Sequence, residues 1–446
     1  MSIAGPLFLE LLLGIGMGLI GTSLAAHISD ASAAAFALGN HVFGMLFMLF
    51  RVIGAGVSVA ITQSLGSGRT AFARRIAFAV LGASTWIGIV TALLAATTAA
   101  PLMQVMNAPP EVLPLAAGFL AMLAPALLLD AWFASMSSVL RANLQNRPAL
   151  AVVCLSNVAH LLLAWPLMFG LGPLPALGLY GYALAQILGR GIALAANLAL
   201  WRGRLGLRPR WRDWLRIESA PLAPVLHIGL PGAAETIAYR LAFMVSIATV
   251  GLLGTEALAT QAYVLQISYV ALIFGLATGV AVEIAVGHLI GGGHLHNAGH
   301  LVRRATLIGL AISVVATSIS ALLAPWTLAQ FSQNEKIIAA GTALLWWTVL
   351  LEPGRTFNLI VINALRATGD ARYPVVAGAA SMLIVLAGGS WFLGVYLGLG
   401  LVGVWLAYAA DEWIRGLLMW RRWVTLRWIP HARETHRRLM RESSGA

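Results

Sequence analysis

Long apolar runs recur along the whole chain, and they restrict it to very few folds. A helix needs about 20 apolar residues to cross the hydrocarbon core of a bilayer. Lipid offers no partner to backbone polar groups, so only helices and closed barrels can span it. These runs lack the alternation of barrel strands, and only 10% of the residues are charged, against roughly 25% in soluble domains. The sequence therefore predicts an all-α membrane protein with many spans.

The apolar runs predict twelve transmembrane helices, each near or above the length that a bilayer requires. Runs longer than the bilayer is thick imply tilt or projection beyond the lipid. The predicted spans are 5–27, 34–64, 74–100, 113–140, 149–170, 177–201, 222–251, 258–290, 302–325, 337–365, 373–396 and 400–420.

One short segment occurs twice, after span four and after span ten. The copies begin Leu140-Arg141-Ala142 and Leu365-Arg366-Ala367, which are 225 residues apart, close to half of the chain. An internal repeat of this length fixes the architecture before any local argument. It predicts two pseudo-symmetric six-helix lobes with a central cleft, a geometry typical of alternating access with a site near mid-membrane.

Basic residues predict the orientation, because cationic loops stay on the cytoplasmic side. Arginines follow every even-numbered span, as Arg69, Arg147 and Arg303 do, whereas loops 101–112, 171–176, 252–257 and 397–399 contain no Lys or Arg. Lys336 is the one exception. We therefore expect a multi-pass protein of the cell (inner) membrane with both termini cytoplasmic. The +12 net charge reflects this topology and contact with membrane lipid rather than nucleic acid.

The predicted domains follow from these patterns. Residues 1–203 form the N-terminal six-helix lobe, and 204–220 form a cytoplasmic basic linker that lies on the membrane surface. Residues 221–421 form the C-terminal six-helix lobe, and 422–446 form a polar, basic and partly disordered tail.

The chain resembles the multidrug and toxic compound extrusion (MATE) transporters over nearly its whole length. The resemblance rests on the two Leu-Arg-Ala segments, with Gly229-Leu230-Pro231 opening span seven, Gly287-His288-Leu289-Ile290-Gly291 closing span eight and Leu65-Gly66-Ser67-Gly68 closing span two. It implies cation-coupled export of organic, often cationic or amphipathic, compounds.

The chain departs from the family at positions that often carry acids. Gly21 stands where many members have an aspartate in span one, and Ala164 stands near a second such position in span five. Arg355 replaces an acid of span ten, whereas the symmetric position in span four is Asp130. The family's ion ligands therefore do not transfer directly to this chain.

Ionisable groups inside the membrane are costly, so each is a functional candidate. Asp130 has no basic residue within one helical turn and suits a group that takes and releases protons. Glu235 follows Pro231, which should kink or begin its helix, and Glu283 could share one cation site with it. Buried structural pairing is the alternative for all three. Arg51 and Arg190 could each form an ion pair with one of these acids.

Other membrane-level charges read as partners. Glu352 and Arg355 are three residues apart on one helix face and can pair, either permanently or as a switch. Arg240 lies about 140° round the helix from Glu235, so we expect it to serve another partner. His160 is either a hydrogen-bonding anchor or a titrating group. Asp411 and Arg415 form an i,i+4 pair that reads as structural.

Apolar side chains predict the walls of the substrate cavity, with core or lipid-facing packing as the alternative. We single out Met48, Trp132 and Trp346. No cofactor or metal is expected beyond the coupling ion, H⁺ or Na⁺. We expect a monomer that binds a small-molecule substrate and is not an enzyme, since nucleotide and hydrolase motifs are lacking.

The sequence thus favours a cation-coupled antiporter that exports small amphipathic or cationic organic compounds by alternating access. A flippase for a lipid-linked or anionic amphiphile is the alternative, and it would use the cavity arginines Arg51, Arg190, Arg240 and Arg355. An intramembrane enzyme and an ion channel find no support in the motifs or the two-lobe repeat.

Overall fold

The computed structural model describes residues 3–171 and 175–444. The side chains of 49, 51–53 and 441–444 lie outside the described part, and the predicted role of Arg51 falls there. The spans of the first half are α1 (Ala4–Ala26), α2 (Asp30–Gly66), α3 (Thr70–Thr97), α5 (Leu113–Ala142), α6 (Asn146–Phe169) and α7 (Leu179–Arg204).

The second half repeats this order. Its spans are α8 (Ser219–Gly251), α9 (Thr255–Gly291), α10 (Leu295–Leu322), α12 (Glu335–Ala367), the run Arg372–Tyr396 that holds α13 (Arg372–Ser381) and α14 (Gly389–Trp391), and α15 (Gly400–Val424). Short helices α4 (Ala99–Val105) and α11 (Ala324–Ala329) follow α3 and α10.

Eleven described stretches are long and apolar enough to cross a membrane. The twelfth predicted span is α15, which is 25 residues long. Three of its residues, Asp411, Glu412 and Arg415, are charged and lower its mean hydropathy. These charges are buried inside the bundle, which lets a charged helix lie at membrane depth. The predicted all-α membrane fold is confirmed.

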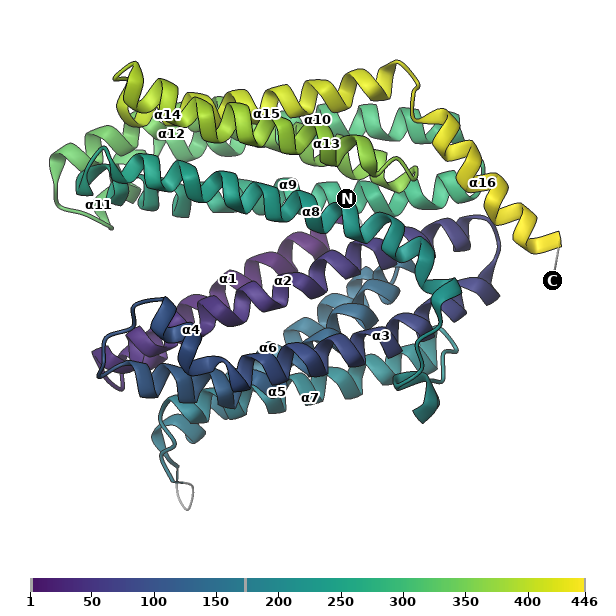
Figure 1. Cartoon of the computed structure of the whole chain (residues 1–446), viewed down its shortest axis with the longest axis horizontal. Coiled ribbons are helices and arrows are strands. Elements are labelled where there is room, and N and C mark those ends of the chain that lie inside the picture. The colour runs from purple at the N-terminus through teal and green to yellow at the C-terminus, as the bar shows by residue number, and fades with distance from the viewer. Residues whose placement is uncertain (1–2, 172–174, 445–446) are drawn as a thin grey trace.

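The helices form two bundles, one from each half of the chain (Figure 1). Three hydrophobic clusters are built almost wholly from the first half and two from α8–α16. Leu222 and Val225 at the start of α8 are the exception, because they pack into a first-half cluster. The beginning of α8 therefore joins the two lobes.

The repeat seen in the sequence is reproduced helix by helix. The bounds of α9 lie 225 residues after those of α2, and those of α10 lie 225 after those of α3. Each lobe thus has the same order of spans and one short helix, α4 or α11, at the same end. The other end of the molecule carries α16 (Ile429–Ser444), and we call it the α16 end (Figure 1).

The lobes meet at the α16 end through glycines of α2 and α9. A Cβ built on Gly66 would lie 2.1 Å from the carbonyl oxygen of His288, and one on Gly291 would lie 2.1 Å from that of Gln63. Backbones approach this closely only where side chains are missing. In Figure 1 the bundles diverge from this contact towards α4 and α11.

Two reciprocal hydrogen bonds reinforce the contact. Gln63 Nε2 of α2 donates to the carbonyl of Ala367, 2.9 Å away, at the end of α12 in the other lobe. His288 Nε2 of α9 contacts the carbonyl of Ala142 at 2.8 Å, at the end of α5. Gln63 and His288 are 225 residues apart, and so are the acceptors, which belong to the two Leu-Arg-Ala segments. The repeated segments therefore close the interface between the lobes.

The linker between the lobes packs against α3. We had predicted that it lies on the membrane surface. Trp86 Nε1 of α3 donates to the carbonyl of Leu215 at 2.9 Å. A Cβ on Gly82 would lie 2.1 Å from the carbonyl oxygen of Arg216. A short 3₁₀ helix, η1 (Trp211–Trp214), lies within the linker and places Trp214 edge-on to Trp132, with ring centroids 4.9 Å apart.

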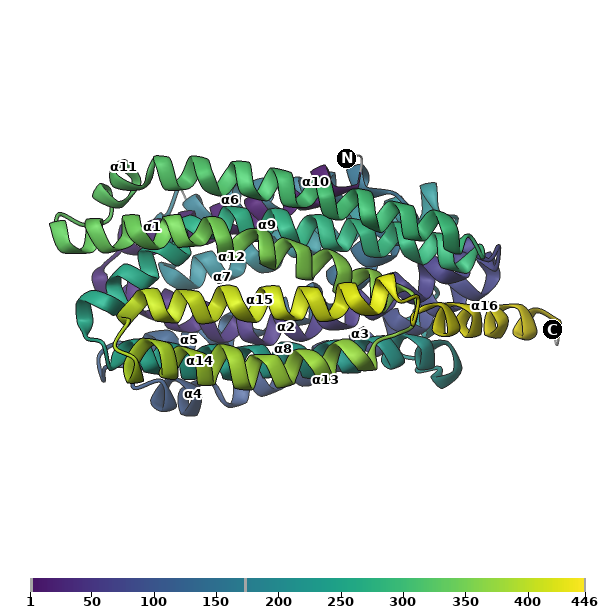
Figure 2. The ribbon, with the colours of Figure 1, turned by 90° about the horizontal axis from the view of Figure 1, so that it is seen from above.

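We predicted a partly disordered tail, and its residues 429–444 form a helix with specific contacts. Trp423 and Trp428 stack at 4.4 Å and anchor its start. His436 Nδ1 lies 2.9 Å from the carbonyl of Gly291, and Thr435 Oγ1 donates to that of Thr368. In Figure 2 α16 extends beyond the rest of the bundle. These contacts place α16 against the ends of α9 and α12, where the C-terminal lobe meets the N-terminal lobe.

Substitution of Gly291 by alanine should open the α16 end, because its new methyl group has no room beside Gln63. We expect spin labels at Ser67→Cys and His294→Cys, in a Cys154→Ser background, to show a longer distance population by electron paramagnetic resonance. Gly299→Ala is the matched control, since no atom lies within 4 Å of its Cβ position. An unchanged distance distribution in Gly291→Ala would contradict the role of this contact.

Candidate functional site

Each lobe contains one ion pair at the same place in the repeat. Arg141 Nη1 at the end of α5 lies 2.9 Å from Glu10 Oε1 of α1. Arg366 at the end of α12 pairs with Glu235 of α8. The two arginines are 225 residues apart and so are the two acids, so the pairs are equivalent in the repeat. The arginines that identified the repeat therefore bind the first helix of their own lobe.

Asp130 has a partner that its own helix did not reveal. Arg190 Nε of α7 lies 2.6 Å from Asp130 Oδ1, and Asp130 is fully buried. The guanidinium also stacks over the ring of Phe133, 4.9 Å from its centroid. Asp130 is thus not the unpaired acid that its neighbours in sequence suggested. One positive and one negative charge balance at this place.

Aromatic rings fill the space where the family resemblance implies an acid in span one. A Cβ on Gly21 would lie 2.6 Å from both Phe36 Cζ and Tyr182 Oη. His160 lies edge-on to Tyr182, with centroids 4.6 Å apart, and its Nε2 has no hydrogen-bond partner among the described residues. His160 was predicted to be a charge partner of a membrane acid, but the contact observed is with the ring of Tyr182.

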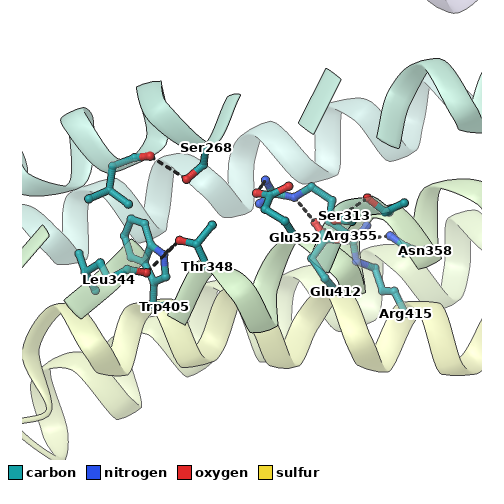
Figure 3. A network of polar contacts seen from close by, with 12 residues as sticks. Ser268, Ser313, Leu344, Thr348, Glu352, Arg355, Asn358, Trp405, Glu412 and Arg415 are labelled. Atoms are coloured by element: carbon teal, nitrogen blue, oxygen red, sulfur yellow. Dashed lines mark hydrogen bonds and ion pairs between the residues drawn. The ribbon is translucent and has the colours of Figure 1, made fainter. Parts of the chain in front are cut away.

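The C-terminal lobe has a larger group of charges between α12 and α15, shown in Figure 3. Arg355 Nη1 donates to Glu352 Oε1 at 2.6 Å, and Arg355 Nε donates to Glu412 Oε1 at 3.1 Å. Arg415 Nη2 contacts Glu412 at 2.9 Å and Asp411 at 2.8 Å. Glu352 Oε2 is buried with no hydrogen-bond partner among the described residues. The predicted pairs exist, but as parts of one network.

Irregular backbone surrounds this network. Pro353 lies inside α12, directly after Glu352, where it removes a helical hydrogen bond. In the span that precedes α15, residues Met382–Gly388 form a π-helical stretch, a feature that is frequent at functional sites. Ser381, directly before that stretch, donates to Asp411 Oδ1 at 2.6 Å. Pro231 likewise lies inside α8, which begins at Ser219, so this proline does not begin the helix and the kink beside Glu235 stays a prediction.

The network continues towards the α16 end. Glu235 and Arg415 flank Gly378, since a Cβ there would lie 3.8 Å from Glu235 Cγ and 3.9 Å from Arg415 Cδ. Glu235 pairs in turn with Arg366. Glu283 of α9 is buried, and Arg366 is near enough to exert an electrostatic influence on it. Buried or partly buried charged groups of α8, α9, α12 and α15 therefore extend through the C-terminal lobe.

The two lobes differ in charge balance. In the described N-terminal lobe the partly buried Glu10 pairs with Arg141, and the buried Asp130 pairs with Arg190. The group of charges in the C-terminal lobe contains five carboxyl groups and three guanidinium groups. They are Glu235, Glu283, Glu352, Asp411 and Glu412, with Arg355, Arg366 and Arg415. Two carboxyl groups thus lack a compensating arginine.

The other predicted site residues are dispersed. Arg240 of α8 is exposed and makes no ion pair with a described residue. Trp132 donates to Thr85 Oγ1 at 2.8 Å, which ties it to α3 and the linker. Met48 is half-buried in α2 and Trp346 is 51% exposed in α12. Their place in a substrate wall stays a prediction.

Comparison with known proteins assigns the chain to a family. The sequence model of the MatE family matches residues 6–165 and 231–391, two segments that again begin 225 residues apart. This chain is a MATE-family transporter. It is a multi-pass membrane protein that moves small molecules and not an enzyme.

Relatives of this MATE transporter match over almost their whole length. An uncharacterized transporter, YisQ of Bacillus subtilis (strain 168), is 30% identical over 96% of this chain and 94% of its own. A probable multidrug resistance protein, NorM of Bradyrhizobium diazoefficiens, is 27% identical over 94% and 92%. The crystal structure of the Vibrio cholerae MATE transporter VcmN in the bent form has a TM-score of 0.85 at 19% identity, covering 97% of this chain and 96% of that one.

Sequence reasoning missed several residues of this MATE chain that the structure brings together. Glu10 and Gln63 were not identified, and Arg190 was named as a possible partner of a membrane acid without Asp130 being singled out. Each lies 225 residues before a counterpart, namely Glu235, His288 and Arg415. Applying the repeat offset to Glu235 and His288 would have pointed to Glu10 and Gln63. The offset does not give the Asp130–Arg190 pair, because the corresponding positions are Arg355 and Arg415.

Loss of Arg190 should destabilise the N-terminal lobe, because Asp130 would remain buried without a counter-charge. Breaking a buried pair costs about 3–5 kcal/mol, so we expect Arg190→Gln to lower the thermal unfolding temperature in detergent by several degrees. Asp130→Asn in the same chain should restore most of the loss. A double variant as unstable as the two single losses added together would contradict this pairing.

Proposed function

We propose that this transporter exports a small amphipathic organic compound in exchange for protons, by alternating access between its two lobes. The excess of carboxyl groups in the C-terminal lobe carries the proposal. Two negative charges without a partner are expensive at membrane depth. Two carboxyl groups therefore carry a bound proton or lie beside a bound cation. Glu352 and Glu283 are the two whose negative charge is least compensated by arginine.

The surroundings of these acids favour H⁺ over Na⁺. A guanidinium contacts Glu352 at 2.6 Å, and Arg366 is near enough to Glu283 to exert an electrostatic influence on it. A positive charge this close disfavours either cation, but a proton needs only one free carboxylate oxygen, whereas a metal cation needs several oxygen ligands. The free Oε2 of Glu352 is the atom that would take the proton.

The N-terminal lobe has no comparable excess among its described residues. Asp130 is matched by Arg190, and the position of Gly21 is filled by the rings of Phe36 and Tyr182. Of the four acids that the sequence nominated for ion coupling, we therefore retain Glu235, Glu283 and Glu352. Asp130 becomes a structural member of its lobe.

Adjacent residues at the end of α12 link the charges to the movement. Arg366 pairs with Glu235 inside the lobe, and the carbonyl of the next residue, Ala367, accepts from Gln63 of the opposite lobe. Protonation of Glu235 or Glu283 would weaken the hold on Arg366 and shift the last helical turn. That shift would loosen the interlobe hydrogen bond, which biases the equilibrium between the two states.

The α16 end is assigned to the cytoplasm, because the arginine-rich loops lie there. The lobes are joined at this end and diverge at the other (Figure 1), which corresponds to an outward-facing arrangement. Both termini are then cytoplasmic. The names of relatives, such as the probable multidrug resistance protein NorM, support the export of organic compounds.

A flippase for a lipid-linked anion is the rival function. It requires several free arginines between the lobes. Arg190 and Arg355 are instead bound to acids inside their lobes, and Arg240 is left exposed. Because most of the positive charge is bound within the lobes, the antiporter explains more of the structure.

Neutralising the C-terminal acids should abolish proton coupling. In proteoliposomes with an imposed pH gradient, Glu352→Gln and Glu283→Gln should lose gradient-driven uptake of an amphipathic dye and retain counterflow exchange. Asp130→Asn is the matched control and should remain coupled if it is folded. Separate Na⁺ gradients should have no effect. Uncoupling by Asp130→Asn alone, with both glutamine variants still coupled, would reverse the assignment.

The proposed orientation predicts which side of the membrane labels with a thiol reagent. Ser67→Cys in the Cys154→Ser background should react with a membrane-impermeant maleimide in inside-out vesicles and not in intact spheroplasts. Lys336→Cys, at the opposite end of the bundle, should show the reverse pattern. Equal labelling of Ser67→Cys from both sides would rule the orientation out.

A further inference from the structure

We propose that Arg240 selects the substrate, and that the exported compound is an amphiphile carrying an anionic group such as a carboxylate, sulfonate or phosphate. The inference rests on the proposed export function and narrows it. It replaces the expectation of a cationic compound that the family resemblance implied.

Helical register places Arg240 on the side of α8 that looks towards the other lobe. Near its start α8 touches α2, since a Cβ on Gly56 would lie 2.4 Å from the carbonyl oxygen of Val225 and 3.3 Å from Gly229 Cα. Arg240 follows Gly229 by eleven residues, about three full turns, and therefore lies within about 20° of the same face. It stands about 16 Å further along the helix.

Arg240 is exposed there, and no hydrogen bond or ion pair joins it to the described part of the chain. An arginine facing lipid at this depth would be very costly, so such residues face protein or a water-filled path. The other arginines at membrane depth whose side chains are described, Arg190, Arg355 and Arg415, each hold an acid. Arg240 is therefore available to a ligand.

Carboxyl groups that would attract a cation are missing from the same level in the described chain. The acids of the spans are buried within a lobe, as Asp130, Glu283 and Glu352 are, or paired, as Glu10 is with Arg141. Asp30 and Glu256 lie in the first turns of α2 and α9, at the far end of the molecule. No described carboxyl group therefore offsets the positive charge of Arg240 on this face of α8.

The surroundings of Arg240 are apolar. Met244 and Ile247 lie within about 60° of the same face of α8 and are 64% and 39% exposed. On α2, Met45 lies eleven residues from Gly56 towards the far end and is 48% exposed. Met45 therefore stands opposite Arg240 at the same height. One guanidinium among flexible apolar side chains suits a molecule with one anionic group and a hydrophobic body.

The test is equilibrium binding without any ion gradient. A matched pair of pyrene amphiphiles, one with a sulfonate and one with a trimethylammonium group, is titrated into the full-length protein in phosphatidylcholine nanodiscs. The wild type should bind the sulfonate at least tenfold more tightly. Arg240→Gln should remove this preference, Arg240→Lys should retain part of it, and Arg240→Glu should invert it. Arg304→Glu, an exposed arginine of α10, is the control with the same change in net charge and should match the wild type.

The inference is overturned if the wild type binds the trimethylammonium probe as tightly as the sulfonate, or if Arg240→Gln keeps the wild-type ratio. An Arg304→Glu variant that also inverts the preference would show a general charge effect and would overturn it too. Size-exclusion chromatography confirms folding, and if Arg240→Glu fails to fold, the wild type and the Gln and Lys variants decide. Sulfonate-selective binding without proton-driven transport would refute the antiport and leave the role of Arg240 intact.

Discussion

Each charge in the membrane-spanning part of this protein must meet an opposite charge or reach water or a ligand, because lipid does not solvate it. The N-terminal lobe meets this requirement with ion pairs, Glu10 with Arg141 and Asp130 with Arg190. The C-terminal lobe does not, since its group of charges from Glu283 to Glu352 contains more acids than arginines. A missing positive charge of this kind is what a coupling proton can supply. In the mechanism that we propose, this imbalance relates the energetics of the bundle to its transport cycle.

The two lobes have one backbone plan and different polar contents. Arg190 and Arg415 occupy equivalent places, but the first meets one acid and the second meets Asp411 and Glu412. Within the same repeat, Asp130 corresponds to Arg355. Symmetry therefore positions the helices, whereas a few substitutions give the C-terminal lobe its network. The irregular helix at Met382–Gly388 lies beside that network and has no equivalent irregularity in the described helix α6.

The repeated Leu-Arg-Ala segments perform two tasks with adjacent residues. The arginine binds an acid within its own lobe, and the carbonyl of the alanine accepts a hydrogen bond from the opposite lobe. Glycines 66 and 291 let the backbones approach closely enough for those bonds. Helix α16 contacts the same region through His436 and Thr435. Charge state and lobe contact therefore share one structural element at the end of α12.

The sequence alone determined the membrane class, the twelve helices and the two-fold repeat. These follow from apolar run lengths and from identity at a fixed spacing, which are properties of the linear chain. It also indicated the Glu352–Arg355 pair, because three residues bring side chains together on one helix. Only the tertiary structure decided that Arg190 compensates Asp130, that Arg366 joins Glu235, and that α16 is ordered. These contacts join helices distant in sequence, and their partners depend on how the helices pack and rotate, which local periodicity does not encode.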